Sequence, residues 1–233
     1  MIKHKSQFIS NILSPAIRLW LRSQLTSVDN IKLDIQAGDK DILKGRIDRV
    51  YLLAEKATYR GIRFHKASVK AESIAFNLRE ILLRKPFRLL HPFFIEGEIL
   101  LLTADLQQGL NSPLLSRGLE ELVYLLAEKI LPPSFNSSLF FPPIHWKHLK
   151  IFPDKFLLTG ITGNKSYLSL TAGVRLKNPN TLLFTPLEIS GIASTSPLIV
   201  EDFEIFLGED VFIQSLHLNP QHIVCHGKVK VFI

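Results

Sequence analysis

The sequence lacks features that mark several common protein classes. Its 233 residues include one cysteine, Cys225, which excludes an intramolecular disulfide framework and a structural zinc module built on paired thiolates. No window of about 18 residues is free of charged side chains, so a membrane-spanning helix is not expected. With 46% apolar residues, 12 glycines and 13 prolines, the chain is neither disordered, collagen-like nor a coiled coil.

Signatures of catalysis and secretion are also missing. The sequence contains no Gly-x-Ser-x-Gly elbow, no phosphate-binding glycine loop and no His-Glu-x-x-His pair. Basic residues at positions 3–5 resemble the start of a signal peptide, but Pro15 and Arg18 interrupt the apolar run and no cleavage site follows. We therefore expect a non-enzymatic, cytoplasmic protein, peripheral on a membrane at most. The glycosylation patterns at Asn136 and Asn164 would then be chance matches.

Apolar surface is what the chain has in excess. The mean hydropathy is +0.18, and 16 phenylalanines stand against 4 tyrosines. Phenylalanine buries ring area without a polar group, which favours apolar packing over polar recognition. Without a membrane span, this surface predicts a large core, a lipid-sized cavity or a membrane-facing patch.

Positive charge is concentrated in the first part of the chain. Residues 1–95 carry 18 lysines and arginines against 8 acidic residues, whereas residues 96–233 carry 10 against 13. The resulting charges of +10 and −3 indicate an anionic partner, either a membrane surface or nucleic acid. We expect no nucleic acid, because the chain lacks a zinc finger, an RNP-like strand and a basic recognition helix.

Two long helices are predicted. The first begins with Ser14 as N-cap and Pro15 in the first turn, and its apolar residues follow at helical spacing. The second spans about Ser112–Leu131, capped by Ser112. Its main apolar stripe is Leu115, Leu119, Leu122, Leu126 and Ile130, and the stripe is widened by Leu114, Val123 and Leu125. Such a broad stripe predicts a helix that the fold surrounds on most sides.

The remaining segments read as strands. Alternating polarity marks residues 31–37, 168–177 and 222–233, and residues 94–103 are expected to form another strand. A longer stretch, 43–78, has turns near Gly45 and Gly61. A phase change near Glu72-Ser73 predicts a bulge, and residues 78–83 predict a short helix. Clean alternation favours an antiparallel sheet, so the predicted class is α+β.

Several runs in residues 11–131 resemble one known family. They are Gly38–Gly45, Ala57–Ile62, Asn77-Leu78 with Lys85–Leu90, and Thr103–Leu106 leading to Ser112–Leu115. Together they resemble the LmeA-like phospholipid-binding family, and within it the cyanobacterial members. Residues 144–233 fit only by their strand pattern.

The resemblance implies a fold similar to the tubular lipid-binding proteins. In that α+β fold a long curved antiparallel β-sheet is wrapped around a long helix, and acyl chains lie in the tube between them. It also implies a single domain over residues 1–233, phospholipid or another acyl lipid as partner, and no catalysis or cofactor. The candidate groove residues are Leu115, Leu119, Leu122 and Leu126.

Basic and aromatic residues are the candidates for contact with an anionic membrane surface. They are Arg18, Trp20 and Arg22 on the first helix, and Arg84, Lys85, Phe87 and Arg88 in the segment before Pro92. The alternatives are an ordinary packing helix and a solvated turn whose phenylalanines are core. The segment from Phe135 to Pro143 could likewise dip into lipid or pack on the body as a connector.

A metal site is not expected. His222 and His226 share one face of a strand while Cys225 points away, so the three side chains do not converge. The leading hypothesis is therefore lipid binding or transfer at a cytoplasm-facing membrane surface through an apolar groove. The alternative is a structural or scaffold domain that binds another protein through an exposed apolar face.

Overall fold

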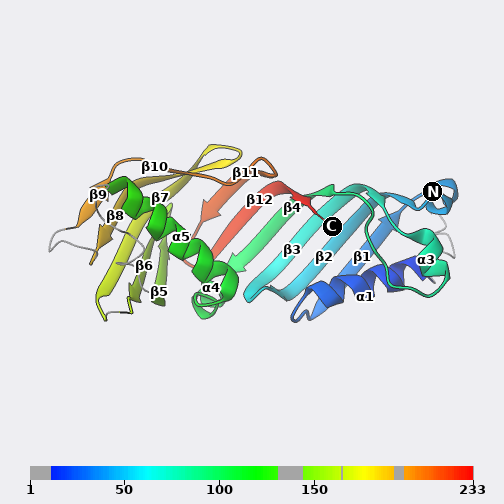
Figure 1. Cartoon of the computed structure of the whole chain (residues 1–233), viewed down its shortest axis with the longest axis horizontal. Helices are drawn as coiled ribbons and strands as arrows, with labels where there is room; N and C mark the ends of the chain where they lie inside the picture. Colours follow the sequence, from blue (N-terminus) through cyan, green and yellow to red (C-terminus); the bar gives the residue numbers. More distant parts are fainter. Residues whose placement is uncertain (1–11, 131–143, 164, 192–196, 233) are drawn as a thin grey trace.

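Two six-stranded antiparallel sheets form the body of the molecule. The computed structural model describes residues 12–130, 144–163, 165–191 and 197–232. The first sheet runs β1 (Asn30–Gln36), β2 (Arg46–Tyr59), β3 (Ile62–Ala75), β4 (Phe93–Leu102), β12 (His222–Val231) and β11 (Val211–Leu218). The second runs β10 (Phe203–Phe206), β8 (Thr181–Ser190), β7 (Tyr167–Asn178), β6 (Lys155–Ile161) and β5 (His145–Phe152), and β9 (Leu198–Val200) pairs with β8. The sheets follow one another along the long axis (Figure 1).

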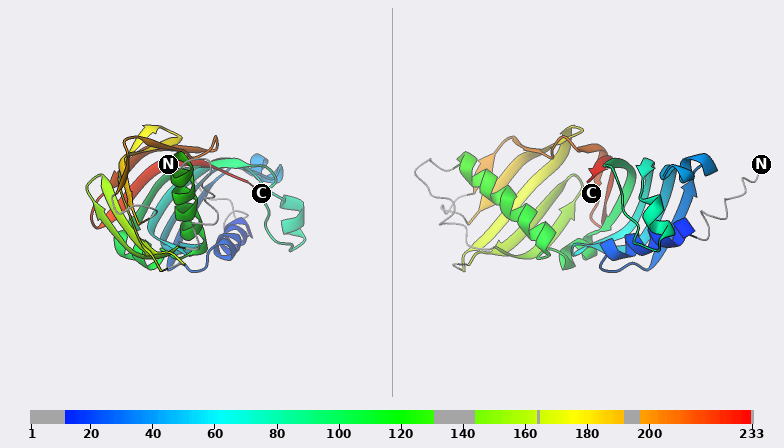
Figure 2. Two further views of the ribbon diagram at one scale, coloured as in Figure 1. Left: turned by 60° about the vertical axis from the view of Figure 1, so that its left-hand side comes forward. Right: turned by 45° about the vertical axis from the view of Figure 1, so that its right-hand side comes forward.

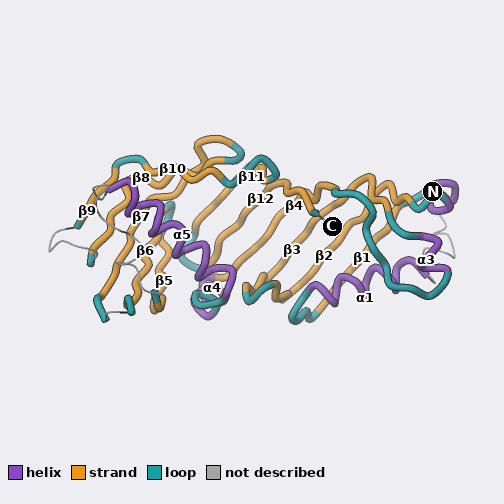
Figure 3. The backbone as a smooth tube through the Cα atoms, viewed as in Figure 1, coloured by secondary structure: helices purple, strands orange, loops and turns teal. Residues whose placement is uncertain are grey.

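Antiparallel sheet dominates, as the alternation predicts, but it is divided in two. The pairing of β4 with β12 brings residues 93–102 and 222–231 together, so the C-terminal hairpin completes the first sheet. The second sheet is formed by residues 145–206. The expectation of one continuous sheet around one helix is therefore replaced by two open sheets, each with its own helix (Figure 3).

One helix packs on each sheet. Helix α1 (Ser14–Gln24) covers part of the first sheet and contributes Ile17 to a core with Ile35 and Ile47. Helix α5 (Pro113–Ile130) contributes Leu122, Val123 and Leu126 to a second core. The views in Figure 2 show both helices against the concave side of the curved sheets.

Details of these helices differ from the sequence prediction. Ser14 is the first helical residue, and the N-cap is Leu13. The Ser112 hydroxyl is buried without a hydrogen-bond partner, so its side chain does not cap α5. Leu114 and Leu125 are 41% and 39% exposed, whereas Val123 is buried, so α5 buries one side instead of most of its circumference.

Three short helices lie at the ends of strands. They are α2 (Asp39–Leu43), α3 (Leu78–Leu82) and α4 (Thr103–Gln108). Only α3 was predicted. From α4 and the turn after it, Gln107 and Asn111 bond the backbone of β5: Asn111 Nδ2 donates to Trp146 O (2.9 Å) and Trp146 N donates to Asn111 Oδ1 (3.0 Å). These bonds satisfy backbone groups along the β5 edge of the second sheet.

The predicted phase change in β3 is confirmed. Ala71 and Ile74 are both buried although three residues apart, and Ser73 has a positive φ of 56°. Strand β2 changes phase at the same level, since Ile47 and Val50 are also both buried. Because the two irregularities face each other, the β2–β3 register is the same on both sides of them. The predicted bulge, which would add one residue to a single strand, is therefore wrong for this pair.

Candidate functional site

An apolar cavity of about 170 Å³ lies between α1 and the first sheet. Its helical wall is Ile17, Trp20 and Leu21, and its sheet wall comes from β1, β2, β3, β4 and β12. Every lining side chain is apolar, so water inside would find no polar partner. Leu33 and Leu52 are directly paired on β1 and β2, and Leu52 pairs with Val69 of β3, so three lining residues form one row across the sheet.

The segment between α3 and β4 closes one side of the cavity. Phe87 and Leu89 line it, and the Phe87 ring lies 5.7 Å from the ring of Trp20 and 5.9 Å from that of Phe76, centroid to centroid. Asn77, itself buried, fixes this segment: its Nδ2 donates to Pro86 O (2.9 Å), and Arg88 N donates to its Oδ1 (2.7 Å). The cavity wall is thus bonded to the end of β3.

Glu80 of α3 completes this anchoring. Asn77 Nδ2 also donates to Glu80 Oε2 (3.0 Å), and Arg88 Nη2 lies 3.4 Å from the same oxygen. The hydrogen bond from Asn77, and then the charges of Arg88 and Lys85, lower the pKa of Glu80. A lowered pKa means that this contribution to stability is present at neutral pH and is lost as the pH falls through the titration of Glu80.

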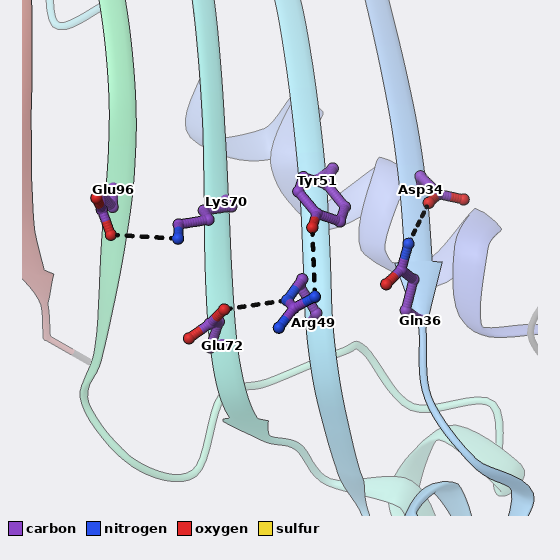
Figure 4. A network of polar contacts seen from close by, with 7 residues as sticks. All are labelled: Asp34, Gln36, Arg49, Tyr51, Lys70, Glu72 and Glu96. Atoms are coloured by element: carbon purple, nitrogen blue, oxygen red, sulfur yellow. Dashed lines mark hydrogen bonds and ion pairs between the residues drawn. The ribbon is translucent and has the colours of Figure 1, made fainter.

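The opposite face of the same sheet is polar and charged. Arg49 Nε lies 3.0 Å from Glu72 Oε1, and Lys70 Nζ lies 3.4 Å from Glu96 Oε2, in both cases between directly paired residues on neighbouring strands (Figure 4). Such exposed pairs add little stability each. They show that the two faces of the first sheet differ: one carries charged side chains in water, and the other presents only hydrocarbon to the cavity.

The predicted membrane-contact residues divide into two groups. Arg18, Arg22, Arg84, Lys85 and Arg88 are exposed. Trp20 and Phe87 instead face each other in the cavity wall, and Phe87 is only 6% exposed. Phe87 therefore cannot reach a membrane from this position, because it packs as core, which was the alternative interpretation.

Exposed leucines lie beside the cations, and the sequence prediction missed them. Leu19 is 73%, Leu82 57% and Leu83 71% exposed, next to Arg18, Arg84 and Lys85 in the chain. Residues 78–91 carry four cations and one carboxylate. Helical spacing could have indicated the exposure of Leu82, because a short helix that buries Ile81 must turn the next residue outward.

The four predicted groove residues lie elsewhere, on α5. Leu122 and Leu126 are buried in the second core, and Leu115 and Leu119 are half-buried against it. The cavity beneath α1 is formed by other residues, and a lipid-contacting role for these leucines stays a prediction.

The histidines and Cys225 do not converge. His226 pairs with Glu98 of β4 and lines a hollow on the polar face, whereas Cys225 pairs with Ile99 and lies on the opposite face. Within the described residues no group of three or more His, Cys, Asp or Glu side chains is placed to hold a metal ion. The segment from Phe135 to Pro143 lies outside the described residues. No helix in the described part of the chain has the length and apolar character needed to cross a bilayer.

A concave sheet that holds a purely apolar cavity against a helix is the arrangement of a protein that binds hydrophobic molecules. Residues 5–228 match the LmeA-like phospholipid-binding family, so the chain belongs to this family. The match covers nearly the whole chain, including the C-terminal strands that the sequence patterns joined only loosely to it. Searches of curated proteins and of solved structures found no match.

Proposed function

We propose that the protein binds a phospholipid without catalysis, with an acyl chain in the cavity beneath α1. The whole chain acts as one lipid-binding unit whose first sheet carries the site. The observation that carries the proposal is the purely apolar lining of this cavity in a member of a phospholipid-binding family. A cavity of about 150 Å³ holds a benzene-sized molecule, so 170 Å³ is room for a segment of an acyl chain.

The same proposal places the protein at an anionic, cytoplasm-facing membrane surface. Arg84 and Lys85 are exposed in the segment whose Phe87 and Leu89 line the cavity, so the cations lie near the cavity wall. Near an anionic bilayer each cation contributes about 1 kcal/mol. Headgroups held there would be close to the site that receives the chain, which suits uptake or transfer of a lipid.

Tryptophan fluorescence tests the cavity directly, because the chain has two tryptophans in different places. Trp20 lines the cavity, and Trp146 is 1% exposed in the second core. A phospholipid brominated on its acyl chains should quench the emission of Trp20, since bromine quenches at close contact. In the Trp20→Phe variant the remaining emission, from Trp146, should be quenched much less.

Equal quenching of wild type and Trp20→Phe, or no quenching of either, would contradict binding in the cavity. Extraction of lipid from the purified protein, followed by mass spectrometry, gives an independent measurement. Stoichiometric phospholipid supports the proposal. Absence of lipid in both measurements would favour a scaffold domain that uses an apolar face to bind another protein.

Charge reversal tests the membrane surface. In the Arg84→Glu/Lys85→Glu variant we expect binding to anionic vesicles to weaken at least about tenfold, since two attractions of about 1 kcal/mol become repulsions. Wild-type binding should also fall as salt rises from low concentration, because screening acts beyond about 8 Å at 0.15 M. Vesicle co-sedimentation measures both effects.

A matched control reverses two exposed cations on the second sheet and its helix, Arg117→Glu/Lys147→Glu. This variant has the same net charge but should bind nearly as well as wild type. If both double variants lose the same affinity, attraction depends on net charge and not on this surface. Arg88 is left unchanged because it pairs with Glu80.

A further inference from the structure

The apolar face that forms the cavity floor continues across the rest of the first sheet. On β4 and β12 its residues alternate with those of the other face, and on β11 they continue past a register shift between Ile213 and Ser215. In cross-strand register they run Ile95, Val229 and Val211, then Ile99, Cys225 and Leu216. Apart from Ile95, these residues are half-buried, and they belong to neither of the two hydrophobic cores in the part of the chain that the structure describes. In Figure 1 no described helix lies over β4 and β12, between α1 and α5.

One row crosses all six strands without a polar residue. It starts at Leu33, Leu52 and Val69 in the cavity floor and continues through a facing pair of glycines, Gly97 and Gly227, to Ile213. A Cβ atom at Gly97 would stand 2.1 Å from Ser68 O, and one at Gly227 would stand 2.6 Å from Phe212 O. Glycine is therefore required by the close approach of the neighbouring strands, and it leaves the centre of the row without side chains.

We propose that this row, the glycine trough (Leu33, Leu52, Val69, Gly97, Gly227, Ile213), is an acyl-chain site that extends the cavity across β4, β12 and β11. The inference rests on the proposed function and specifies its ligand as a long-chain lipid. The cavity alone accommodates only a short segment, whereas five strand spacings of about 4.8 Å give the trough about 24 Å. A chain in one leaflet of a bilayer occupies about 15 Å, half of the hydrocarbon core.

The trough also leads toward the second sheet. Leu216 of β11, two residue pairs from the row, shares a hollow with Val174 of β7, and Val174 packs against the second core. Ile213 N donates to Pro179 O (2.6 Å), so the edge strand β11 is bonded to the turn after β7. An acyl chain that fills the trough would reach this junction.

The single cysteine offers a direct test, because Cys225 stands beside Gly227 on the trough face. Burial raises the pKa of its thiol, so labelling by a maleimide is compared at one fixed pH. Dioleoyl phosphatidylglycerol should slow the labelling at least about tenfold. Bromobenzene, which is small enough to enter the cavity without reaching the trough, should quench Trp20 and leave the labelling rate unchanged.

Paired variants on β12 separate the trough from the cavity. Val229→Phe places a ring on the trough face, and Val224→Phe places the same ring on the polar face. Val229→Phe should bind dioleoyl phosphatidylglycerol at least tenfold more weakly while bromobenzene still quenches Trp20, and Val224→Phe should bind both normally.

The outcomes distinguish the two proposals. If the brominated phospholipid quenches Trp20 but Cys225 reacts at its lipid-free rate in the presence of the same lipid, the trough proposal is overturned and cavity binding survives. If no lipid binds the wild type, both are overturned. The labelling experiment needs no variant, so it decides even if Val229→Phe does not fold.

Discussion

The Ala71→Phe protein should purify without phospholipid and melt within a few degrees of wild type. Ala71 is 8% exposed on β3 and lines the cavity beneath α1, so a phenyl ring at this position would occupy space that we assign to an acyl chain. Filling an existing cavity avoids most of the strain that added volume causes in a close-packed interior. Lipid extraction with mass spectrometry and a thermal melt measure the two effects.

The second core provides the matched control. Ala172 lies on the buried face of β7 with 0% exposure among Leu158, Leu170 and Leu187. The same substitution there should overpack the core at a cost of about 1–3 kcal/mol, or about 2–12 °C in melting temperature for a chain of this size. Its folded fraction should keep the lipid. If Ala71→Phe destabilises as much as Ala172→Phe and keeps its lipid, the space beneath α1 is not the binding site.

Local patterns in the sequence predicted the elements better than their assembly. Alternation identified β7 and β12, and the phase change near Ser73 was confirmed, because both reflect contacts within one strand and its immediate face. The division into two sheets depends on β12 pairing with β4, more than a hundred residues earlier in the chain. An alternating strand states which face is buried but not which strand lies beside it, so this pairing could not be read from the sequence.

The same limit explains the position of the cavity. The groove was expected on α5 because the family resemblance implies a long helix inside the sheet, and α5 is the long apolar helix of the sequence. In the structure a stripe with Leu122 and Leu126 is filled by the second sheet, while the shorter α1 leaves space above Ala71 and Val69. Apolar periodicity shows that a helix side is covered, but whether protein or ligand covers it depends on how closely the opposing small residues pack. Gly97 and Gly227 lie opposite each other because of the register between β4 and β12, which the sequence likewise does not show.

The Leu82→Asp/Leu83→Asp protein should fold normally and lose about 100-fold or more in affinity for anionic vesicles. Both leucines are exposed, so their replacement removes no core contact. Burying a leucine side chain in hydrocarbon contributes about 1.5–3 kcal/mol, and two of them contribute two or more powers of ten. The added carboxylates would also offset the attraction of Arg84 and Lys85 to anionic headgroups.

This loss should differ from that of the charge-reversed protein in its response to salt. Screening weakens the attraction of Arg84 and Lys85 but does not weaken insertion of Leu82 and Leu83, so wild type should keep part of its affinity at high salt and the leucine variant should keep almost none. The control Ile199→Asp/Phe206→Asp changes two side chains of similar exposure, 58% and 60%, on the second sheet. Equal losses in the two double variants would show that the membrane does not select the α3 end. A loss confined to Leu82→Asp/Leu83→Asp would place the bilayer against the segment whose inner side closes the cavity and whose Phe87 contacts Trp20.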